Sequence, residues 1–355
     1  MKIAQVAPLY EAVPPRLYGG TERVVAHLTN ALVDLGCEVT LFASAEAGTR
    51  ARLIPCRDQA IRLDPAPLKS DLAAHLSMLA EVRRRAADFD VIHFHTEMIH
   101  FPLFEDQAHR TLTTLHGRLD MKDLAEVYAR WRDFPLVSIS DFQRTPMPNA
   151  NWAGTVHHGF PPELYTFHLR SEGYLAFLGR ISPEKRPDRA IEIARRCGMR
   201  LKMAAKVDAA DEAYWREVIE PMVRAEPLVE FIGEIGDREK SAFLGGAAAL
   251  LFPIDWPEPF GLVMIEAMAC GAPVIAVGSG SVPEVIDDGV TGFIVEDVDQ
   301  AVAAVGRLGT LRRTAVRRSF ETRFSAEAMA RRYLDLYAAV GRAQPAATAM
   351  AAAGR

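Results

Sequence analysis

The stretch ALLFPIDWPEPFGLVMIEAMACGAPVIAVGSGS, residues 249–281, contains the unit from which the whole fold is built. The apolar runs at 249–254 and 272–277 are each typical of a buried strand. The segment between them predicts a helix that begins near Phe260–Gly261. A strand, a helix and a second strand in this order build a parallel sheet covered by helices. The stretch therefore predicts an α/β fold.

The same alternation runs along the chain on both sides of this stretch. Further strands are predicted at 2–8, 37–44, 90–95, 110–117, 134–140, 173–182, 199–207 and 228–235, with helical patterns between them. The alternation of strand and helix patterns is interrupted over 151–173, which is rich in Gly, Pro and His. We therefore predict two Rossmann-like, doubly wound domains.

The domain boundaries follow from this pattern. We predict an N-terminal domain at 1–160, a linker at 161–173 and a C-terminal domain at 174–324. A helix over 325–341, capped by Ser325, is expected to pack across the domains, and a disordered tail is expected at 342–355. Two such domains imply a cleft, and ligands of open parallel sheets bind at the carboxyl ends of the strands.

Composition narrows the class of protein. The 355 residues suffice for two domains, and the 49% of hydrophobic and 25% of charged residues are typical of a globular protein. A net charge of −5 argues against a dedicated nucleic-acid binder. The 4 cysteines are scattered and form no CxxC, which favours a reducing, cytoplasmic location. No apolar run reaches the roughly 18 residues that a membrane span needs.

Two glutamates in the opening stretch need an explanation. Glu258 lies between two prolines, directly before the predicted helix, whereas Glu266 lies inside it among apolar neighbours. An unpaired buried carboxylate is costly, and a ligand with two adjacent hydroxyls, such as a ribose, would satisfy Glu266. The helix also presents the N–H groups of Phe260, Gly261 and Leu262 as an anion site. The alternative is that Glu258 is a surface acid and Glu266 a paired or partly solvated helix residue.

Two further loops carry groups suited to phosphate. Gly19 and Gly20 precede a helix, and their lack of side chains would let its N-terminus approach a phosphate; a tight turn is the alternative. Arg180 and Lys185 flank a turn at the carboxyl end of a predicted strand. Two cations on one loop suit a diphosphate, although charged loops are often only solvated.

These residues lie in segments that resemble a known family. EPFGLVMIE at 258–266 resembles the E-x7-E motif of the retaining nucleotide-sugar glycosyltransferases of family four, which have the two-domain GT-B fold. The resemblance covers most of the chain. It includes YGGTE at 18–22, LHG at 115–117, GRISPEK at 179–185, and APVIAVGSGSVPEVIDDGVTGFIV at 272–295.

The resemblance implies roles for individual residues. Glu266 would hold the ribose of the donor, and Glu258 would hold its sugar with help from the N–H groups of 260–262. The other residues that the resemblance assigns are Arg180 and Lys185 for the diphosphate, Gly19 and Gly20 for the loop that closes over it, His116 for the donor sugar, and Ile235 for the nucleobase. It implies catalysis by His116, Arg180, Lys185 and Glu258 with retention of configuration. No metal cofactor is expected.

The chain departs from the family pattern in two places. The family often carries Asn-Gly-(Ile/Val)-Asp before the linker, where this chain has His158 and Phe160, and Arg186 replaces a frequent glycine. The acceptor therefore stays open between a lipid, a polysaccharide intermediate and a small glycoside. The same fold would also serve a nucleotide-sugar hydrolase or epimerase, or a sensor that binds a nucleotide sugar without turnover.

Other motifs support different chemistry less well. In DFDVIHFHTEMIH, Asp88 and Asp90 precede the strand and His93 and His95 follow toward its other end, so one metal site is disfavoured. His95 and Glu97 are instead placed to meet an acceptor. VGSGSVPE has Pro283 where a dinucleotide fingerprint needs its third glycine. The basic stretches EVRRRAADF and ARWRDF suit a solvated helix face better than peripheral contact with the inner membrane face. The oligomeric state is left open.

Overall fold

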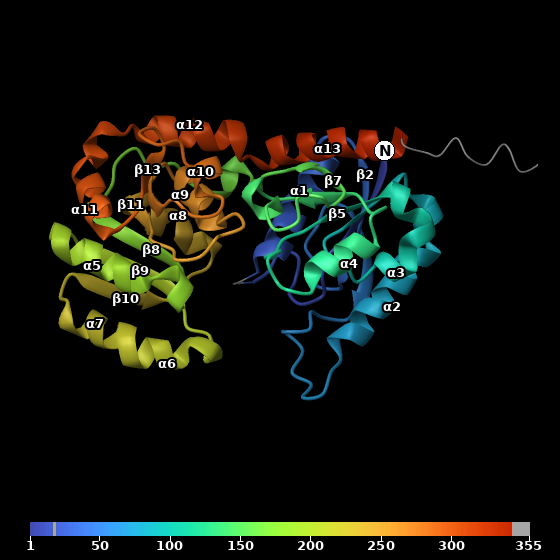
Figure 1. Ribbon diagram of the computed structural model, residues 1–355, viewed down its shortest axis with the longest axis horizontal. Helices are drawn as coiled ribbons and strands as arrows, with labels where there is room; N and C mark the ends of the chain where they lie inside the picture. The colour runs from blue at the N-terminus through green and yellow to red at the C-terminus, as the bar shows by residue number, and fades with distance from the viewer. Residues whose placement is uncertain (17–18, 343–355) are drawn as a thin grey trace, which may run out of the picture. The chain divides into compact units, whose positions relative to one another are not determined.

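The computed structural model describes residues 1–16 and 19–342, and they form two compact units (Figure 1). The first unit contains Met1–Ile139, Arg144–His157 and the last helix from Met329 onward. The second contains Ser140–Gln143 and His158–Ala328. The tail predicted at 342–355 lies outside the described residues, apart from its first position.

The first unit is built on a parallel sheet of seven strands in the order β3-β2-β1-β4-β5-β6-β7. The strands are β1 (Lys2–Val6), β2 (Glu38–Ser44), β3 (Arg52–Arg57), β4 (Val91–Phe94), β5 (Thr111–Thr114), β6 (Leu136–Ser138) and β7 (Trp152–Thr155). The helices are α1 (Gly20–Asp34), α2 (Asp71–Arg84), α3 (Phe101–Phe104) and α4 (Leu124–Arg130). In this unit the sequence pattern predicted all strands except the two at the edges, β3 and β7. In the second unit it missed the edge strand at Gly292–Val295.

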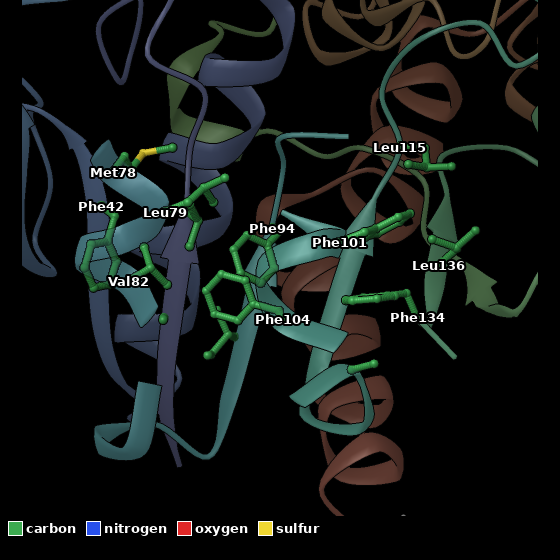
Figure 2. Close-up of a cluster of buried hydrophobic side chains, with 14 of the residues drawn as sticks. Phe42, Met78, Leu79, Val82, Phe94, Phe101, Phe104, Leu115, Phe134 and Leu136 are labelled. Carbon is green, nitrogen blue, oxygen red and sulfur yellow. The ribbon is translucent and has the colours of Figure 1, made fainter. Parts of the chain in front are cut away.

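The core of this unit lies between the sheet and its helices. Figure 2 shows Phe94 of β4 beside Phe104, and Phe101 of α3 against Phe134. The rings of Phe94 and Phe104 meet edge to face at 4.9 Å, and those of Phe101 and Phe134 stack at 4.2 Å. Such ring pairs stabilise a core beyond the area that they bury. The first of these pairs holds β4, the strand that leads to His95.

The second unit repeats the architecture with a parallel sheet of six strands in the order β10-β9-β8-β11-β12-β13. The strands are β8 (Tyr174–Arg180), β9 (Leu201–Lys206), β10 (Val229–Gly233), β11 (Ala247–Phe252), β12 (Val274–Val277) and β13 (Gly292–Val295). The helices are α5 (Pro187–Cys197), α6 (Glu212–Tyr214), α7 (Glu220–Ala225), α8 (Asp237–Gly246), α9 (Leu262–Ala269), α10 (Val282–Val285), α11 (Val298–Gly306) and α12 (Arg313–Arg323). This is the Rossmann strand order.

The last helix, α13 (Ala326–Arg342), begins in the second unit and continues in the first. The Ser325 hydroxyl accepts the Ala328 N–H at 3.1 Å, which confirms the predicted N-cap. Tyr333 and Tyr337 of this helix are fully buried in the first unit. Among the helices of the described residues, none combines the length and the apolar character that crossing a membrane requires.

The strand order places one switch point in each sheet. In the first sheet it lies between β1 and β4, and in the second between β8 and β11. Ligands of doubly wound sheets bind outside the carboxyl ends of the strands at such points. The segments that follow β4, β5, β8 and β11 are therefore where the site residues are sought.

Candidate active site

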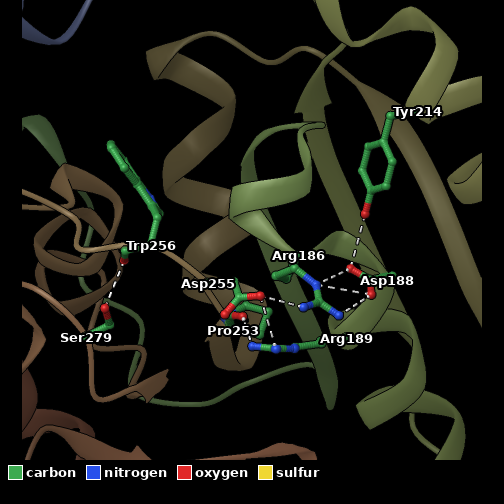
Figure 3. A network of polar contacts seen from close by, with 8 residues as sticks. All are labelled: Arg186, Asp188, Arg189, Tyr214, Pro253, Asp255, Trp256 and Ser279. Atoms are coloured by element: carbon green, nitrogen blue, oxygen red, sulfur yellow. Dashed lines mark hydrogen bonds and ion pairs between the residues drawn. The ribbon is translucent and has the colours of Figure 1, made fainter. Parts of the chain in front are cut away.

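The loop that carries Glu258 leaves β11 and is held in place by the chain after β12. The Ser281 N–H donates to the Glu258 carbonyl at 3.0 Å, and the Ser279 hydroxyl donates to the Trp256 carbonyl at 3.0 Å (Figure 3). Gly280 has φ +62°, and a Cβ there would lie 2.3 Å from the Glu258 carbonyl oxygen. Only glycine fits this close approach, so the turn at 279–281 fixes the backbone of Glu258.

The carboxylate of Glu258 forms an ion pair with Lys185. The Trp256 indole N–H donates to the same oxygen at 2.9 Å, and the Lys185 ammonium lies 4.8 Å from the centre of the Trp256 ring. The two charged side chains are only 19% and 12% exposed, so water screens the pair weakly. The sequence assigned these residues to different parts of a ligand, and the structure binds them to each other.

Arg180, at the end of β8, is surrounded by carboxylates. It pairs with Glu184, and its guanidinium nitrogens lie 3.7 Å from Asp208 and 3.8 Å from Asp211. Burial alone would raise the pKa of Glu184, but hydrogen bonds and the Arg180 charge lower it below its usual value. A phosphate at this position would compete with three acidic side chains for one arginine.

Glu266 lies one turn inside α9 and is buried, as the sequence indicated, but it is not unpaired. The Tyr165 hydroxyl and the Lys240 ammonium both donate to its Oε1, each at 2.9 Å. Glu266 is therefore paired, as the alternative interpretation allowed, and its partners come from distant segments. The ribose assignment of Glu266 then depends on the family resemblance and not on an unsatisfied charge.

The helix after Glu258 begins slightly later than the pattern predicted. Its N-cap is Gly261, with φ +76°, and its first helical residue is Leu262. A Cβ on Gly261 would meet Met264 at 2.8 Å and the Glu258 side chain at 3.4 Å. The glycine thus lets the helix start directly beside the carboxylate, where its N–H groups favour a negative charge.

Arg186, which stands where the family often has glycine, adopts the backbone conformation that glycine favours. Its φ is +53° and its ψ is +52°. Figure 3 shows its guanidinium between Asp188, which it contacts at 2.8 Å, and Asp255, also at 2.8 Å. Asp255 belongs to the loop that carries Glu258, and Arg189 reaches the same carboxylate at 3.4 Å. The departure from the family pattern therefore ties two loops of the site together.

The site residues of the first unit lie beyond β4 and β5. His116 follows β5, and its Nε2 lies 2.9 Å from Nδ1 of His95. The Glu97 carboxylate accepts the backbone N–H of His116 at 3.0 Å. Burial lowers the pKa of the His116 imidazole, so the ring is neutral near pH 7. This end of the sheet therefore presents neutral imidazoles beside the Glu97 carboxylate, whose pKa is raised by burial.

The remaining predicted residues take separate positions. Gly19 is the N-cap of α1, where φ is +155° and a Cβ would lie 2.8 Å from Pro15, and Gly20 begins the helix. The two residues before Gly19 lie outside the described part of the chain. Ile235 lies half-buried in the loop between β10 and α8. Their assignments to the donor stay predictions.

The alternative metal motif is occupied by other contacts. His93 lies 2.7 Å from the Tyr337 hydroxyl and 2.7 Å from the Thr114 hydroxyl, and Asp90 accepts the Lys2 backbone N–H at 2.7 Å. Within residues 1–16 and 19–342 no group of three His, Cys, Asp or Glu side chains is arranged to hold a metal. The expectation of catalysis without a metal stays a prediction.

Two family profiles match the two halves of the chain. The profile described as Glycosyltransferase Family 4 matches residues 18–152. The profile described as Glycosyl transferases group 1 matches residues 168–318. This chain belongs to the family-four glycosyltransferases. The resemblance drawn from the sequence motifs is thereby confirmed.

Relatives of known name agree with this family. The D-inositol 3-phosphate glycosyltransferase of Mycolicibacterium smegmatis is 24% identical over 339 residues, which are 79% of this chain and 76% of that protein. The enzyme of the same name from Mycobacterium marinum is 32% identical over 151 residues. That match covers 39% of this glycosyltransferase and only 30% of the relative's length.

Solved structures share the fold of this glycosyltransferase. AviGT4, a glycosyltransferase involved in avilamycin A biosynthesis, superposes with a TM-score of 0.73 at 24% identity, covering 97% of this chain and 98% of AviGT4. Anabaena HepE in complex with UDP and glucose gives 0.72 at 17% identity, covering 96% of this chain and 100% of HepE. The GT-B prediction of two open, parallel, Rossmann-like sheets is thus confirmed.

The sequence pattern did not indicate several residues of the candidate site. They are Trp256, which orients Glu258, and Lys240 and Tyr165, which hold Glu266. Trp256 lies only two residues before Glu258, so the sequence could have indicated its indole N–H as a donor to that carboxylate. Lys240 lies 26 residues and Tyr165 101 residues from Glu266, and no local pattern connects them.

Proposed function

We propose that this glycosyltransferase moves a sugar from a nucleotide-diphosphate sugar to an acceptor hydroxyl. The observation that carries the proposal is the convergence of Lys185 and Glu258 as an ion pair where β8 and β11 end, at the switch point of the second sheet. A cation for phosphate and a carboxylate for sugar hydroxyls meet there beside the N-terminus of α9. HepE, which shares the fold, is described in complex with UDP and glucose.

In this reaction the bond between the anomeric carbon and the phosphate oxygen breaks, and a bond to the acceptor oxygen forms. The proton of the acceptor hydroxyl passes to the leaving phosphate oxygen on the same face of the sugar, which retains the configuration. Lys185, Arg180 and the N-terminus of α9 stabilise the charge that develops on the diphosphate. Metal-independent catalysis is part of this proposal.

The ion pairs of the site define what the donor must displace. When the diphosphate arrives, Lys185 exchanges Glu258 for a phosphate oxygen, and Glu258 then accepts hydrogen bonds from sugar hydroxyls. Glu266, held by Tyr165 and Lys240, accepts the ribose hydroxyls. His116 is proposed to contact the donor sugar, Gly19 and Gly20 the phosphates, and Ile235 the nucleobase, as the resemblance implies.

A nucleotide-sugar hydrolase or epimerase would use the same donor half-site. The family profiles and the named relatives are glycosyltransferases, which does not favour this alternative. The two reactions are separated by one measurement: a transferase consumes the donor only when an acceptor is present. Donor consumption at the same rate without any acceptor would contradict the proposal.

The first experiment is a thermal-shift panel of UDP, GDP and ADP sugars, because a bound donor stabilises the folded state by mass action. A donor at about 100 times its Kd adds about 2.7 kcal/mol to the free energy of unfolding. We expect one nucleotide series to raise the Tm and Lys185→Ala to lose the response. No response to any nucleotide sugar would refute the proposed donor class.

Acceptors are then screened with the donor that raises the Tm most. Inositol 3-phosphate belongs in the screen because of the named relatives, together with glycolipids, polysaccharide intermediates and small glycosides. A lipid acceptor would bring the enzyme to a membrane surface, and co-sedimentation with vesicles of that lipid tests this. Transfer to a soluble acceptor without vesicles would remove the need for any peripheral membrane contact.

A further inference from the structure

A chain of hydrogen-bonded side chains runs through the interior of the first unit from His116 to the last helix. His95 Nδ1 lies 2.9 Å from His116 Nε2, and His95 Nε2 lies 2.8 Å from the Gln5 amide oxygen. The Gln5 amide nitrogen donates to the Tyr337 hydroxyl at 2.9 Å. This series of hydrogen bonds therefore connects His116, just after β5, to α13.

The chain continues beyond Tyr337 to the neighbouring strands. The Tyr337 hydroxyl lies 2.7 Å from His93 Nδ1, and His93 Nε2 lies 2.7 Å from the Thr114 hydroxyl. Thr114 in turn lies 2.8 Å from the Tyr333 hydroxyl. Gln5, His93, His95, Thr114, Tyr333 and Tyr337 are all at most 2% exposed. Buried polar groups of this kind keep their hydrogen bonds, because losing one without a replacement lowers the free energy of unfolding.

The direction of each bond depends on the next. A neutral imidazole has one N–H donor and one acceptor nitrogen, and an amide has a donor end and an acceptor end. With the Gln5 oxygen toward His95, His95 carries its proton on Nε2 and its Nδ1 must accept from His116. The Tyr337 hydroxyl, which accepts from Gln5, then donates to His93 Nδ1. All three imidazoles are thereby Nε2–H tautomers.

Turning the Gln5 amide would reverse every bond between His116 and Thr114 together. The amide nitrogen would donate to His95 Nε2, so His95 and His116 would both become Nδ1–H tautomers, and Tyr337 would donate to Gln5 and accept from His93. Mixed states leave a buried donor facing a donor, an acceptor facing an acceptor, or the Tyr337 O–H without an acceptor in this network. The three histidines therefore share one tautomeric state.

We propose that Gln5, His95 and Tyr337 are positioning residues that set the tautomer of His116, and that α13 acts on the site through Tyr337. In the arrangement observed, His116 Nε2–H is committed to His95, and its Nδ1 is a hydrogen-bond acceptor. This nitrogen is buried in the structure, and a sugar hydroxyl that reaches it on binding must donate to it, so the network selects the direction of that bond. This last consequence rests on the proposed function.

A purely structural network would need only to be satisfied, and both polarities satisfy it. The distinction is therefore measurable as the tautomer of each ring and not as stability alone. Tyr337→Phe removes the hydroxyl that joins Gln5 to His93. Tyr333→Phe is the matched control, because Tyr333 lies on the same helix, is equally buried and bonds only the Thr114 end of the chain among the contacts described.

The experiment measures the ring ¹⁵N resonances of His93, His95 and His116 by NMR in the full chain. We expect three Nε2–H rings in the wild type and one shared tautomer in Tyr333→Phe. In Tyr337→Phe we expect His95 and His116 to show averaged resonances, because the Gln5 amide can turn. A melting curve confirms that each variant is folded.

Gln5→Glu provides a second variant that keeps the network bonded. A carboxylate at this position accepts from both His95 Nε2–H and Tyr337, so His95 and His116 should stay Nε2–H while His93 switches to Nδ1–H. Identical His116 resonances in the wild type and in folded Tyr337→Phe would overturn the proposal, and so would unlike tautomers in the wild-type chain.

The activity readout separates this proposal from the proposed function. We expect Tyr337→Phe to lower kcat by roughly threefold to tenfold with the donor KM unchanged within about twofold, and Tyr333→Phe to change neither. A shifted His116 resonance in a protein that transfers no sugar would support the network and refute the transferase. Transfer activity with an unshifted resonance would do the reverse.

Discussion

The two units share a strand order, but different kinds of side chain lie at their switch points. The first unit offers a neutral set of imidazoles, an amide and hydroxyls that are bonded to one another. The second offers ion pairs, among them Lys185 with Glu258 and Lys240 with Glu266. The same backbone scaffold therefore supports either kind of site, and the side chains at the strand ends decide which one is built.

The difference has a physical consequence for ligand binding. An ion pair can exchange one of its members for a charged ligand, because the lysine keeps an anionic partner when a phosphate replaces the carboxylate. A neutral network gains nothing from a charged ligand and instead offers hydrogen bonds of fixed direction. The second unit is thus suited to the nucleotide diphosphate and the first to sugar hydroxyls. Four predictions test this contrast.

The largest effect is expected when the second unit loses its phosphate cation. Lys185→Ala should lower kcat/KM by about 1,000-fold, or about 4 kcal/mol, because the developing charge on the leaving diphosphate loses its partner. Arg195→Ala is the control, since it removes an exposed cation that pairs with Glu192 in the same unit. Steady-state kinetics on both variants measure this change in kcat/KM. Full activity in Lys185→Ala would contradict the proposed function.

Glu266→Ala should lower kcat/KM by about a hundredfold, chiefly through a higher donor KM. This variant also leaves Lys240 without its buried partner, which destabilises the fold for a separate reason. The double variant Glu266→Ala, Lys240→Ala removes that penalty. We expect the double variant to recover the Tm but not the donor KM. Recovery of the KM as well would assign Glu266 a purely structural role.

Most of the fold could be predicted from the sequence, because most strands and helices follow from local hydrophobic patterns. Central strands such as β11 and β12 are continuous apolar runs, which are typical of strands buried on both faces. The edge strand β3, RLIPCR, contains arginines and a proline and is only half-buried, and β7 is a short WAGT. Edge strands need less burial, so their sequences carry a weaker signal.

The site was predictable in its residues but not in its pairings. Motif spacing indicated Lys185, Glu258 and Glu266, yet gave no sign that Lys185 would bind Glu258, 73 residues away. The alternation of His93 and His95 along a strand placed both on one face, but their partner Tyr337 lies 244 residues beyond His93. Such contacts arise from the packing of distant segments, and a single sequence does not record them.

The contrast between the units should also appear in their stability toward acid. Burial lowers the pKa of His93 and of His100 well below 6.5, and it lowers that of His116 too. Below pH 6.5 the unfolded chain then binds protons at these histidines that the folded unit does not, so their contribution to the free energy of unfolding falls as the pH falls. Burial raises the pKa values of Glu22 and Glu97, which oppose this effect in part. At about pH 5 each fully buried histidine costs about 2 kcal/mol.

The ion pair of Arg186 with Asp188 in the second unit should respond at lower pH. The pKa of Asp188 would be raised by burial, but the bonds from Arg186 lower it below its usual 3.8, so this contribution is lost only below about pH 4. Hydrogen exchange of β4 and β5 amides against β8 and β9 amides, corrected for intrinsic rates, measures the two units separately. His100→Phe should reduce the acid sensitivity of the first unit. Equal destabilisation of both units at about pH 5 would contradict this account.

The smallest effect is expected at Arg186, where two contributions oppose each other. Arg186→Gly relieves a left-handed backbone conformation that costs about 1–2 kcal/mol for a residue with a side chain. It also removes the ion pairs with Asp188 and Asp255, which at 27% exposure of the arginine stabilise by about 1 kcal/mol or less. The free energy of unfolding should therefore change by less than about 1 kcal/mol.

Activity should change more than stability in this variant, because Asp255 belongs to the loop that positions Glu258. We expect Arg186→Gly to lower kcat/KM by roughly threefold, since a loosened loop holds the carboxylate less often in its working geometry. Arg186→Lys is the matched variant: it keeps the charge and the backbone strain but loses the fork that joins two carboxylates. It should be both less stable and less active. An Arg186→Gly enzyme as active as the parent would show that the turn at 279–281 alone fixes Glu258, and that the ion pairs of this unit matter only where the donor binds.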